Sequence, residues 1–70
     1  MRTVEVNFNR RNGDNNICLG RAIKTIGGAL VRPGDRVRVT GDDLQVVADI
    51  VEQGGVLVAV PCWDTLAWVN

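Results

Sequence analysis

A turn signal runs directly into a strand signal in the stretch Arg32-Pro33-Gly34-Asp35-Arg36-Val37-Arg38-Val39-Thr40. Pro33 presets φ for the first inner position of a turn, and Gly34 tolerates the positive φ that the next position can require. After Asp35, whose carboxylate can accept hydrogen bonds from nearby backbone N–H groups, apolar and polar residues alternate. That period of two is typical of a strand with one buried and one solvated face. The stretch therefore predicts a turn followed by a half-buried strand.

Two strands are predicted before this stretch. Residues 3–8 alternate between apolar and polar side chains, and residues 17–24 follow as a return strand in which Gly20 indicates a bulge. Between them, Asn12-Gly13 is the preferred dipeptide of a two-residue hairpin turn, because both positions need positive φ. We therefore expect an N-terminal hairpin whose inward-facing residues include Ile17, Leu19 and Ile23.

Residues 44–52 fit two structures. As a strand, they place Leu44, Val46, Ala48 and Ile50 on one face; as a helix, they place Leu44, Val47, Ala48 and Val51 there. Four of these nine residues are β-branched, and glycines bound the segment closely on both sides. Both features favour the strand.

The remainder of the chain predicts one more hairpin and a short last strand. Gln53-Gly54-Gly55 reads as a turn, and residues 56–60 are wholly apolar, so that strand should be central or covered on both faces. Pro61 should end its pairing, residues 62–65 can make a single helical turn, and residues 66–69 can form the last strand. The expected fold is mainly β, a small antiparallel barrel of five or six short strands with one short helical turn before the last strand, in a single domain spanning residues 1–70.

A known fold resembles part of this pattern. The run from Pro33 to Val39, the paired strands up to Val60 and the turn at residues 63–66 are similar to the later strands of SH3-like barrels, over about half of the chain. The resemblance implies a binding module more often than an enzyme. Gly34 to Arg38 is also similar to a segment of small plasmid-borne dihydrofolate reductases, but their Val-Gln-Ile-Tyr substrate motif has no counterpart here.

The charges are segregated along the chain. Eight basic and eight acidic residues give a net charge of zero, but all the basic residues lie at or before Arg38. That part also holds three acids, so it carries 8 − 3 = +5, while residues 39–70 hold five acids and carry −5. Such a division can supply complementary surfaces for association.

Composition argues against catalysis. The chain contains no His, Tyr or Ser, so the usual nucleophile and base pairings are missing. Cys62 lacks an adjacent activating base and is expected to be a buried thiol beside Trp63. Two cysteines without His cannot complete a four-ligand zinc site within one chain. We therefore expect no enzyme activity, no catalytic residue, no metal and no cofactor. The sequence shows no signal-peptide core and no membrane-spanning segment, so we also expect a cytoplasmic protein with both thiols reduced and no membrane contact.

Two binding functions remain, and they use the same residues differently. The preferred one is a protein–protein interaction or self-assembly module, in which unlike charges attract and the tryptophans, unless they belong to the core, anchor the contact. The alternative is a nucleic-acid-binding barrel, which requires the first hairpin to pack beside residues 36–40 so that the arginines share one face. Ordinary solvated arginines paired with acids of a neighbouring strand, such as Asp49 and Glu52, would explain the same pattern. The candidate binding residues are Arg10, Arg11, Arg21, Arg36, Arg38, Trp63 and Trp68.

Overall fold

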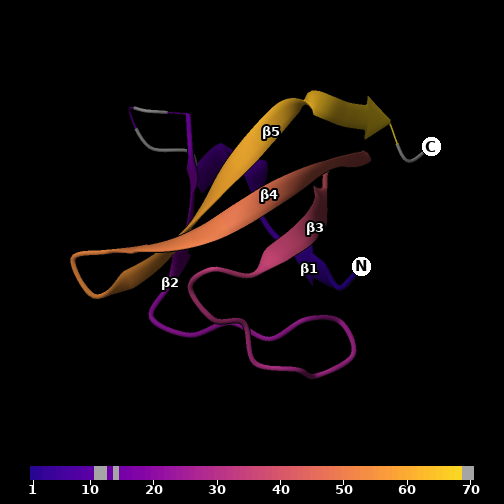
Figure 1. The fold of residues 1–70 in the computed structure, drawn as a ribbon. Helices are drawn as coiled ribbons and strands as arrows, with labels where there is room; N and C mark the ends of the chain where they lie inside the picture. The colour runs from indigo at the N-terminus through magenta and orange to yellow at the C-terminus, as the bar shows by residue number, and fades with distance from the viewer. Residues whose placement is uncertain (11–12, 14, 69–70) are drawn as a thin grey trace.

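Three consecutive strands form an antiparallel meander in the computed structural model, which describes residues 1–10, 13 and 15–68, with Arg10 described by its backbone alone (Figure 1). They are β3 (Arg36–Gly41), β4 (Leu44–Gln53) and β5 (Val56–Trp68). β1 (Thr3–Glu5) and β2 (Ile17–Gly20) extend the two edges, giving the order β1-β3-β4-β5-β2. A single turn of 3₁₀ helix, η1 (Phe8–Arg10), follows β1.

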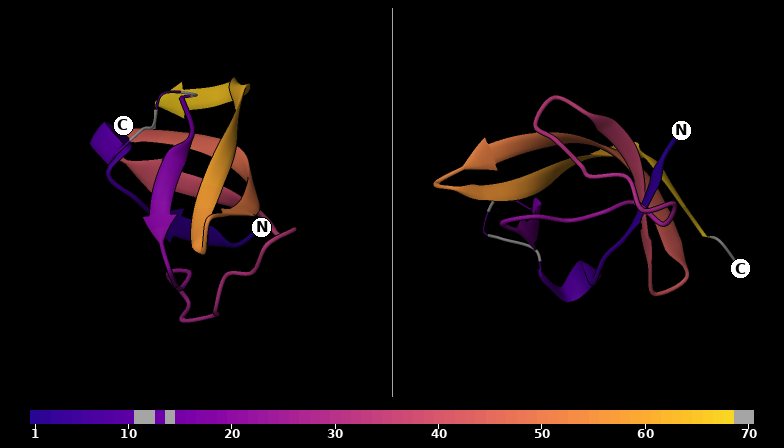
Figure 2. Two further views of the ribbon diagram at one scale, coloured as in Figure 1. Left: turned by 90° about the vertical axis from the view of Figure 1, so that its left-hand side faces the viewer. Right: turned by 90° about the horizontal axis from the view of Figure 1, so that it is seen from below.

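The sheet is mixed and strongly curled. β1 runs parallel to β3, whereas the other neighbouring strands are antiparallel, so the expectation of a wholly antiparallel barrel is wrong. Figure 2 shows the five strands bending into an open half-barrel. Its concave side holds the core, made by Val4, Phe8, Ile17, Leu19, Val31, Val37, Val39, Val46, Ala48, Ile50, Leu57 and Ala59.

The turn that precedes β3 has the geometry its sequence predicts. The Asp35 N–H donates to the Arg32 carbonyl at 3.1 Å, and Gly34 has φ of 94° between them, as the second inner position of a type II turn requires. The Asp35 carboxylate accepts a hydrogen bond from the Arg32 N–H at 2.9 Å. The Ile50 carbonyl accepts from the Gly34 N–H at 2.7 Å, which ties the turn to β4.

Residues 44–53 form a strand, which settles the two alternatives. β4 pairs with β3 from Gly41↔Leu44 to Arg36↔Asp49, across a turn in which Asp42 and Asp43 both have positive φ. Its side chains alternate, and Val46, Ala48 and Ile50 are buried on the core face with Leu44 packed against them. The opposite turn, Gly54-Gly55, also has two positive φ values and connects β4 to β5.

The expected N-terminal hairpin is wrong, because its two strands lie at opposite edges of the sheet. β1 pairs with β3, in the register Thr3↔Arg38, and the Val6 N–H donates to the Thr40 carbonyl at 2.8 Å. β2 pairs with β5 instead, in the register Ile17↔Ala59. The wholly apolar residues 56–60 explain this choice: β5 lies centrally only if a strand occupies each of its edges.

Both N-terminal strands are also shorter than the alternation predicted. β1 ends at Glu5, and the chain then enters η1, where Phe8 is buried in the core. β2 ends at Gly20, whose φ is 89° and where the register with β5 shifts, so the predicted bulge is confirmed. The predicted Asn12-Gly13 turn lies partly outside the described residues, because Asn12 is not among them.

β5 continues past the two features that were expected to end it. Pro61 stands opposite Ala48, beyond the last β2 partner at Ala59, so its missing N–H faces an edge on which no ladder continues. The helical turn expected at residues 62–65 is absent. Val47 pairs with Cys62 and Gln45 with Ala67, so residues 63–66 form a bulge opposite Val46 alone.

Candidate functional site

The seven candidate residues lie on separate parts of the sheet. Arg36 and Arg38 are exposed on β3, Arg21 is exposed directly after β2, and both tryptophans are exposed on β5. Arg10 is the last residue of η1, and Arg11 lies outside the described residues. The structure therefore places two of the five candidate arginines on one strand and does not place them beside Arg21.

The arginines of β3 and Arg21 do not form the common basic face that was proposed, because β2 is not a neighbour of β3. β3 has β1 and β4 as neighbours, whereas β2 borders β5, so two strands separate Arg21 from Arg38 in the order of the sheet. The register that was expected to gather the arginines depended on an N-terminal hairpin, and that hairpin does not form. Nucleic-acid binding stays a prediction, and of the described candidate arginines only Arg36 and Arg38 lie on one strand to support it.

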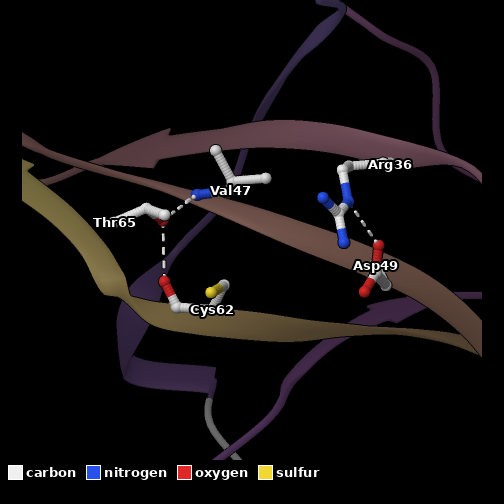
Figure 3. Close-up of polar contacts among 5 residues, drawn as sticks. All are labelled: Arg36, Val47, Asp49, Cys62 and Thr65. Atoms are coloured by element: carbon white, nitrogen blue, oxygen red, sulfur yellow. Dashed lines mark hydrogen bonds and ion pairs between the residues drawn. The ribbon is translucent and has the colours of Figure 1, made fainter.

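Arg36 is engaged in an ion pair rather than free for a ligand. Its Nε donates a hydrogen bond to Oδ1 of Asp49 at 2.9 Å, across the β3–β4 ladder (Figure 3). This hydrogen bond, and secondarily the negative charge of the carboxylate, raise the pKa of the Arg36 guanidinium above its ordinary value. Asp49 is one of the two neighbouring acids that the sequence identified for such pairing. Since both side chains are exposed, the pair orders the surface more than it stabilises the fold.

The end of β5 carries three of the six exposed large apolar side chains in the described residues. In residues 63–68, which we call the arm, Trp63 is 36% exposed, Leu66 42% and Trp68 74%. The arm pairs with β4 only at Gln45 and Leu44, and Figure 1 shows the end of β5 bending to run beside the start of β4. The tryptophans are therefore not core residues.

Thr65 holds the arm to the meander at the bulge. Its hydroxyl accepts a hydrogen bond from the Val47 N–H at 2.9 Å and donates one to the Cys62 carbonyl at 2.7 Å (Figure 3). The side chain thereby replaces a backbone partner where the ladder is interrupted. This contact gives the exposed arm a defined direction instead of a frayed end.

A second apolar surface lies on the convex side of the sheet. Strand alternation directs Val46, Ala48 and Ile50 to the core, so their neighbours in β4 face outward. The cross-strand rows on this side are Arg36↔Asp49↔Val60, Arg38↔Val47↔Cys62 and Val51↔Val58↔Cys18. We call Val47, Val51, Val58 and Val60 the outer patch.

The outer patch has no second layer over it in the described part of the chain. Val47, Val51 and Val60 are half-buried, and Val58, at the centre of its row, is buried. The strand 56–60 is thus central, as expected, but is not covered on both faces. Sequence reasoning missed this surface and Leu66, although the unbroken apolar run at 56–60 was the available signal, since a strand with one wet face would alternate.

The remaining reactive groups do not assemble into a site. Cys18 and Cys62 are both free thiols, the first half-buried and the second exposed, so the expectation of a buried Cys62 is wrong. No group of three or more His, Cys, Asp or Glu side chains that could hold a metal is found in residues 1–10, 13 and 15–68. An open hollow of about 420 Å³ is lined by Arg2, Ala29, Leu30, Arg32 and Asp35.

Comparisons with known proteins supply no relative. No protein-family model, curated protein or solved structure matches this chain. Within the described residues, no helix has the length and apolar character needed to cross a membrane.

Proposed function

We propose that this protein is a small non-enzymatic binding module that acts through protein–protein contact, and that its partner is a second copy of the same chain. One observation carries the proposal: β5 presents Trp63, Leu66 and Trp68 outside the core, at the end of an otherwise well-packed strand. Tryptophan supplies a large share of the binding energy in protein interfaces. An ordered strand that displays two of them is suited to docking.

The size of the domain favours association with a copy of itself. A chain of about this length buries only about 60% of the surface its unfolded form exposes, so its own core leaves little surplus stability. A contact that covers the arm and the outer patch would add buried apolar area in the folded state alone, and would stabilise that state by mass action.

Two further features support a binding role over a catalytic one. The β3–β4–β5 meander carries the sequence likeness to SH3-like barrels, whose members are binding modules more often than enzymes; that support is an analogy of fold. The chain also has no His, Tyr or Ser from which to build the usual acid–base or nucleophilic pairs. The exposed apolar surface, by contrast, needs no reactive group to function.

Sedimentation equilibrium over a range of protein concentrations tests the proposal. The native protein should self-associate, and Trp68→Ser should weaken the association more than tenfold, about the effect of removing an interface hot spot. Ile26→Ser is the matched control, because Ile26 is 68% exposed but lies in the loop between β2 and β3, away from the arm. Its association should equal that of the native protein. A native protein that stays monomeric up to millimolar concentration would refute the proposal.

A fluorescence titration with random oligonucleotides tests the nucleic-acid alternative in parallel. We expect weak binding near physiological salt, because Arg36 is paired with Asp49 and Arg21 lies on a different part of the sheet. If several phosphates were contacted, the affinity would fall with salt with a slope of about −0.9 per phosphate for duplex DNA. Micromolar affinity from a monomeric protein would reverse the ranking of the two functions.

A further inference from the structure

We infer that in this dimer the arm of each copy lies across the outer patch of the other, with Asp64 against Arg38. The inference rests on the proposed function and identifies the surface that receives the arm. The arm is residues 63–68, and the outer patch is Val47, Val51, Val58 and Val60 on the convex side of the sheet. Both surfaces are largely apolar, although the Arg36–Asp49 pair crosses the receiving face between Val47 and Val51.

The arm does not cover Val51 and Val58 of its own copy, although Thr65 contacts Val47 at the edge of the outer patch. Trp68 is paired with Leu44 and Ala67 with Gln45, which holds the arm along the start of β4. The Thr65 hydroxyl, bonded to the Val47 N–H at 2.9 Å, fixes the bulge in the same direction. An arm directed away along β4 cannot fold back over Val51 and Val58. A second copy would cover the half-buried Val47, Val51 and Val60 of this one, and by symmetry the same contact forms twice.

The charges on the two surfaces complement each other. Asp64 is the only charged residue in the arm. On the outer face, Arg36 already pairs with Asp49 at 2.9 Å, whereas Arg38 has Thr3 and Val47 as its cross-strand neighbours. No ion pair joins Arg38 to an acid in the part of the chain that the structure describes. Arg38 is therefore the cation beside the outer patch that an incoming carboxylate can reach.

The dimensions of the arm match those of the receiving face. Neighbouring strands lie about 4.8 Å apart, so crossing from β3 to β2 covers three steps, about 14 Å. The five residues from Asp64 to Trp68 span at most about 13 Å when the chain is fully extended. An arm that crosses the strands with Asp64 at β3 would therefore bring Trp68 over the β5–β2 side of the outer patch. Strands that cross at a large angle are a known mode of packing between sheets.

Reciprocal exchange predicts that two defective variants repair each other. In Asp64→Arg, both contacts of a dimer would place Arg against Arg38, and in Arg38→Asp both would place Asp against Asp64. Each variant alone should associate about tenfold more weakly than the native chain, because two surface pairs change from attraction to repulsion. In an equimolar mixture, a heterodimer would have one native pair and one reversed pair, so sedimentation equilibrium should show association restored to the native level.

A control mixture removes the effect of net charge. Glu52→Arg and Arg21→Asp change the net charge by the same amounts at exposed positions outside the proposed contact. Alone or mixed, they should associate like the native chain. Far-UV circular dichroism of each variant checks that its fold is kept. If the Asp64→Arg and Arg38→Asp mixture associates no better than its components, or the control mixture gains as much, the arm exchange is wrong.

The same measurements separate the two proposals. If the native chain associates and Trp68→Ser weakens it, but mixing the charge variants restores nothing, self-association stands and only the exchange of arms falls. If the native chain is monomeric throughout, both fall together. A dimer that depends on Trp68 and is restored only by the Asp64→Arg and Arg38→Asp mixture supports both.

Discussion

Replacing Gly41 with Ala should loosen the attachment of β1 to β3. An ideal Cβ at position 41 would collide with the backbone carbonyl of Val6 and lie 3.4 Å from Cδ2 of Phe8. The Val6 N–H donates to the Thr40 carbonyl at 2.8 Å, so the Val6 peptide cannot retreat without straining that hydrogen bond. An alanine methyl group fits without steric conflict in most strands, but at position 41 the backbone of Val6 excludes it.

The expected cost is measurable in a domain of this size. Inserting a methyl group into a filled space costs about 1–3 kcal/mol. The smaller conformational entropy of unfolded Ala offsets about 0.4–1 kcal/mol of that. We expect a net loss of about 1–2 kcal/mol, which corresponds to a fall in Tm of roughly 5–15 °C for a chain of this length.

Urea and thermal denaturation of Gly41→Ala and Gly27→Ala make the comparison. Gly27 is exposed, its φ is not positive, and the only atom near its added Cβ is Oγ1 of Thr25 at 3.9 Å. Gly27→Ala should therefore unfold at the native midpoint or slightly above it. If Gly41→Ala unfolds at the same urea concentration as Gly27→Ala, the close approach of Val6 to β3 does not constrain the fold and the reasoning is refuted.

Three further changes probe the bulge, the ion pair and the thiols. Thr65→Val should destabilise the protein by about 1 kcal/mol in urea titrations and Thr65→Ser should not, because only the hydroxyl bridges the bulge; equal effects would contradict this. Arg36→Gln should cause a small, salt-screened loss that is the same at neutral and moderately alkaline pH. Since Asp49 raises the pKa of Arg36, the stabilisation is complete below the ordinary arginine pKa and is lost only as the pH rises through the folded value. In thiol titrations Cys62 should react quickly and Cys18 slowly, and two slow thiols would show that Cys62 is covered, as in a dimer.

Local signals predicted the meander well. The Pro33-Gly34 turn, the alternation that follows Asp35 and the Gly54-Gly55 turn each act within a few residues, and all three are present in the structure. Strand alternation also placed the core-facing side of β4 correctly. These features depend on φ preferences and on burial of one face, both of which a short sequence window contains.

Pairing over long distances could not be predicted in the same way. The alternation of apolar and polar residues does not determine which N-terminal strand pairs with β3 and which with β5. The pairing of β1 with β3 depends on the whole curled sheet. The bulge after Cys62 was read as a helical turn, because a residue such as Thr65 bonds nearby backbone groups in both. For the candidate site, the sequence identifies the tryptophans as binding residues. Their exposure, however, depends on the position of the first residues of β4, which pair with the arm.

Both edge strands of the sheet, β1 and β2, come from the N-terminal half of the chain, and this determines the order in which the strands can pair during folding. β3, β4 and β5 are neighbours in the sequence and are joined by tight turns, so they can meet with little loss of chain entropy. β1 must wait for Arg38 to reach Thr3, and β2 must wait for Ala59 to reach Ile17. On the ribosome, β1 therefore emerges with nothing to pair with until β3 has been synthesised, and β2 has no partner until β5 has been synthesised. We expect this protein to fold from its later segments toward its earlier ones, against the direction in which it is made.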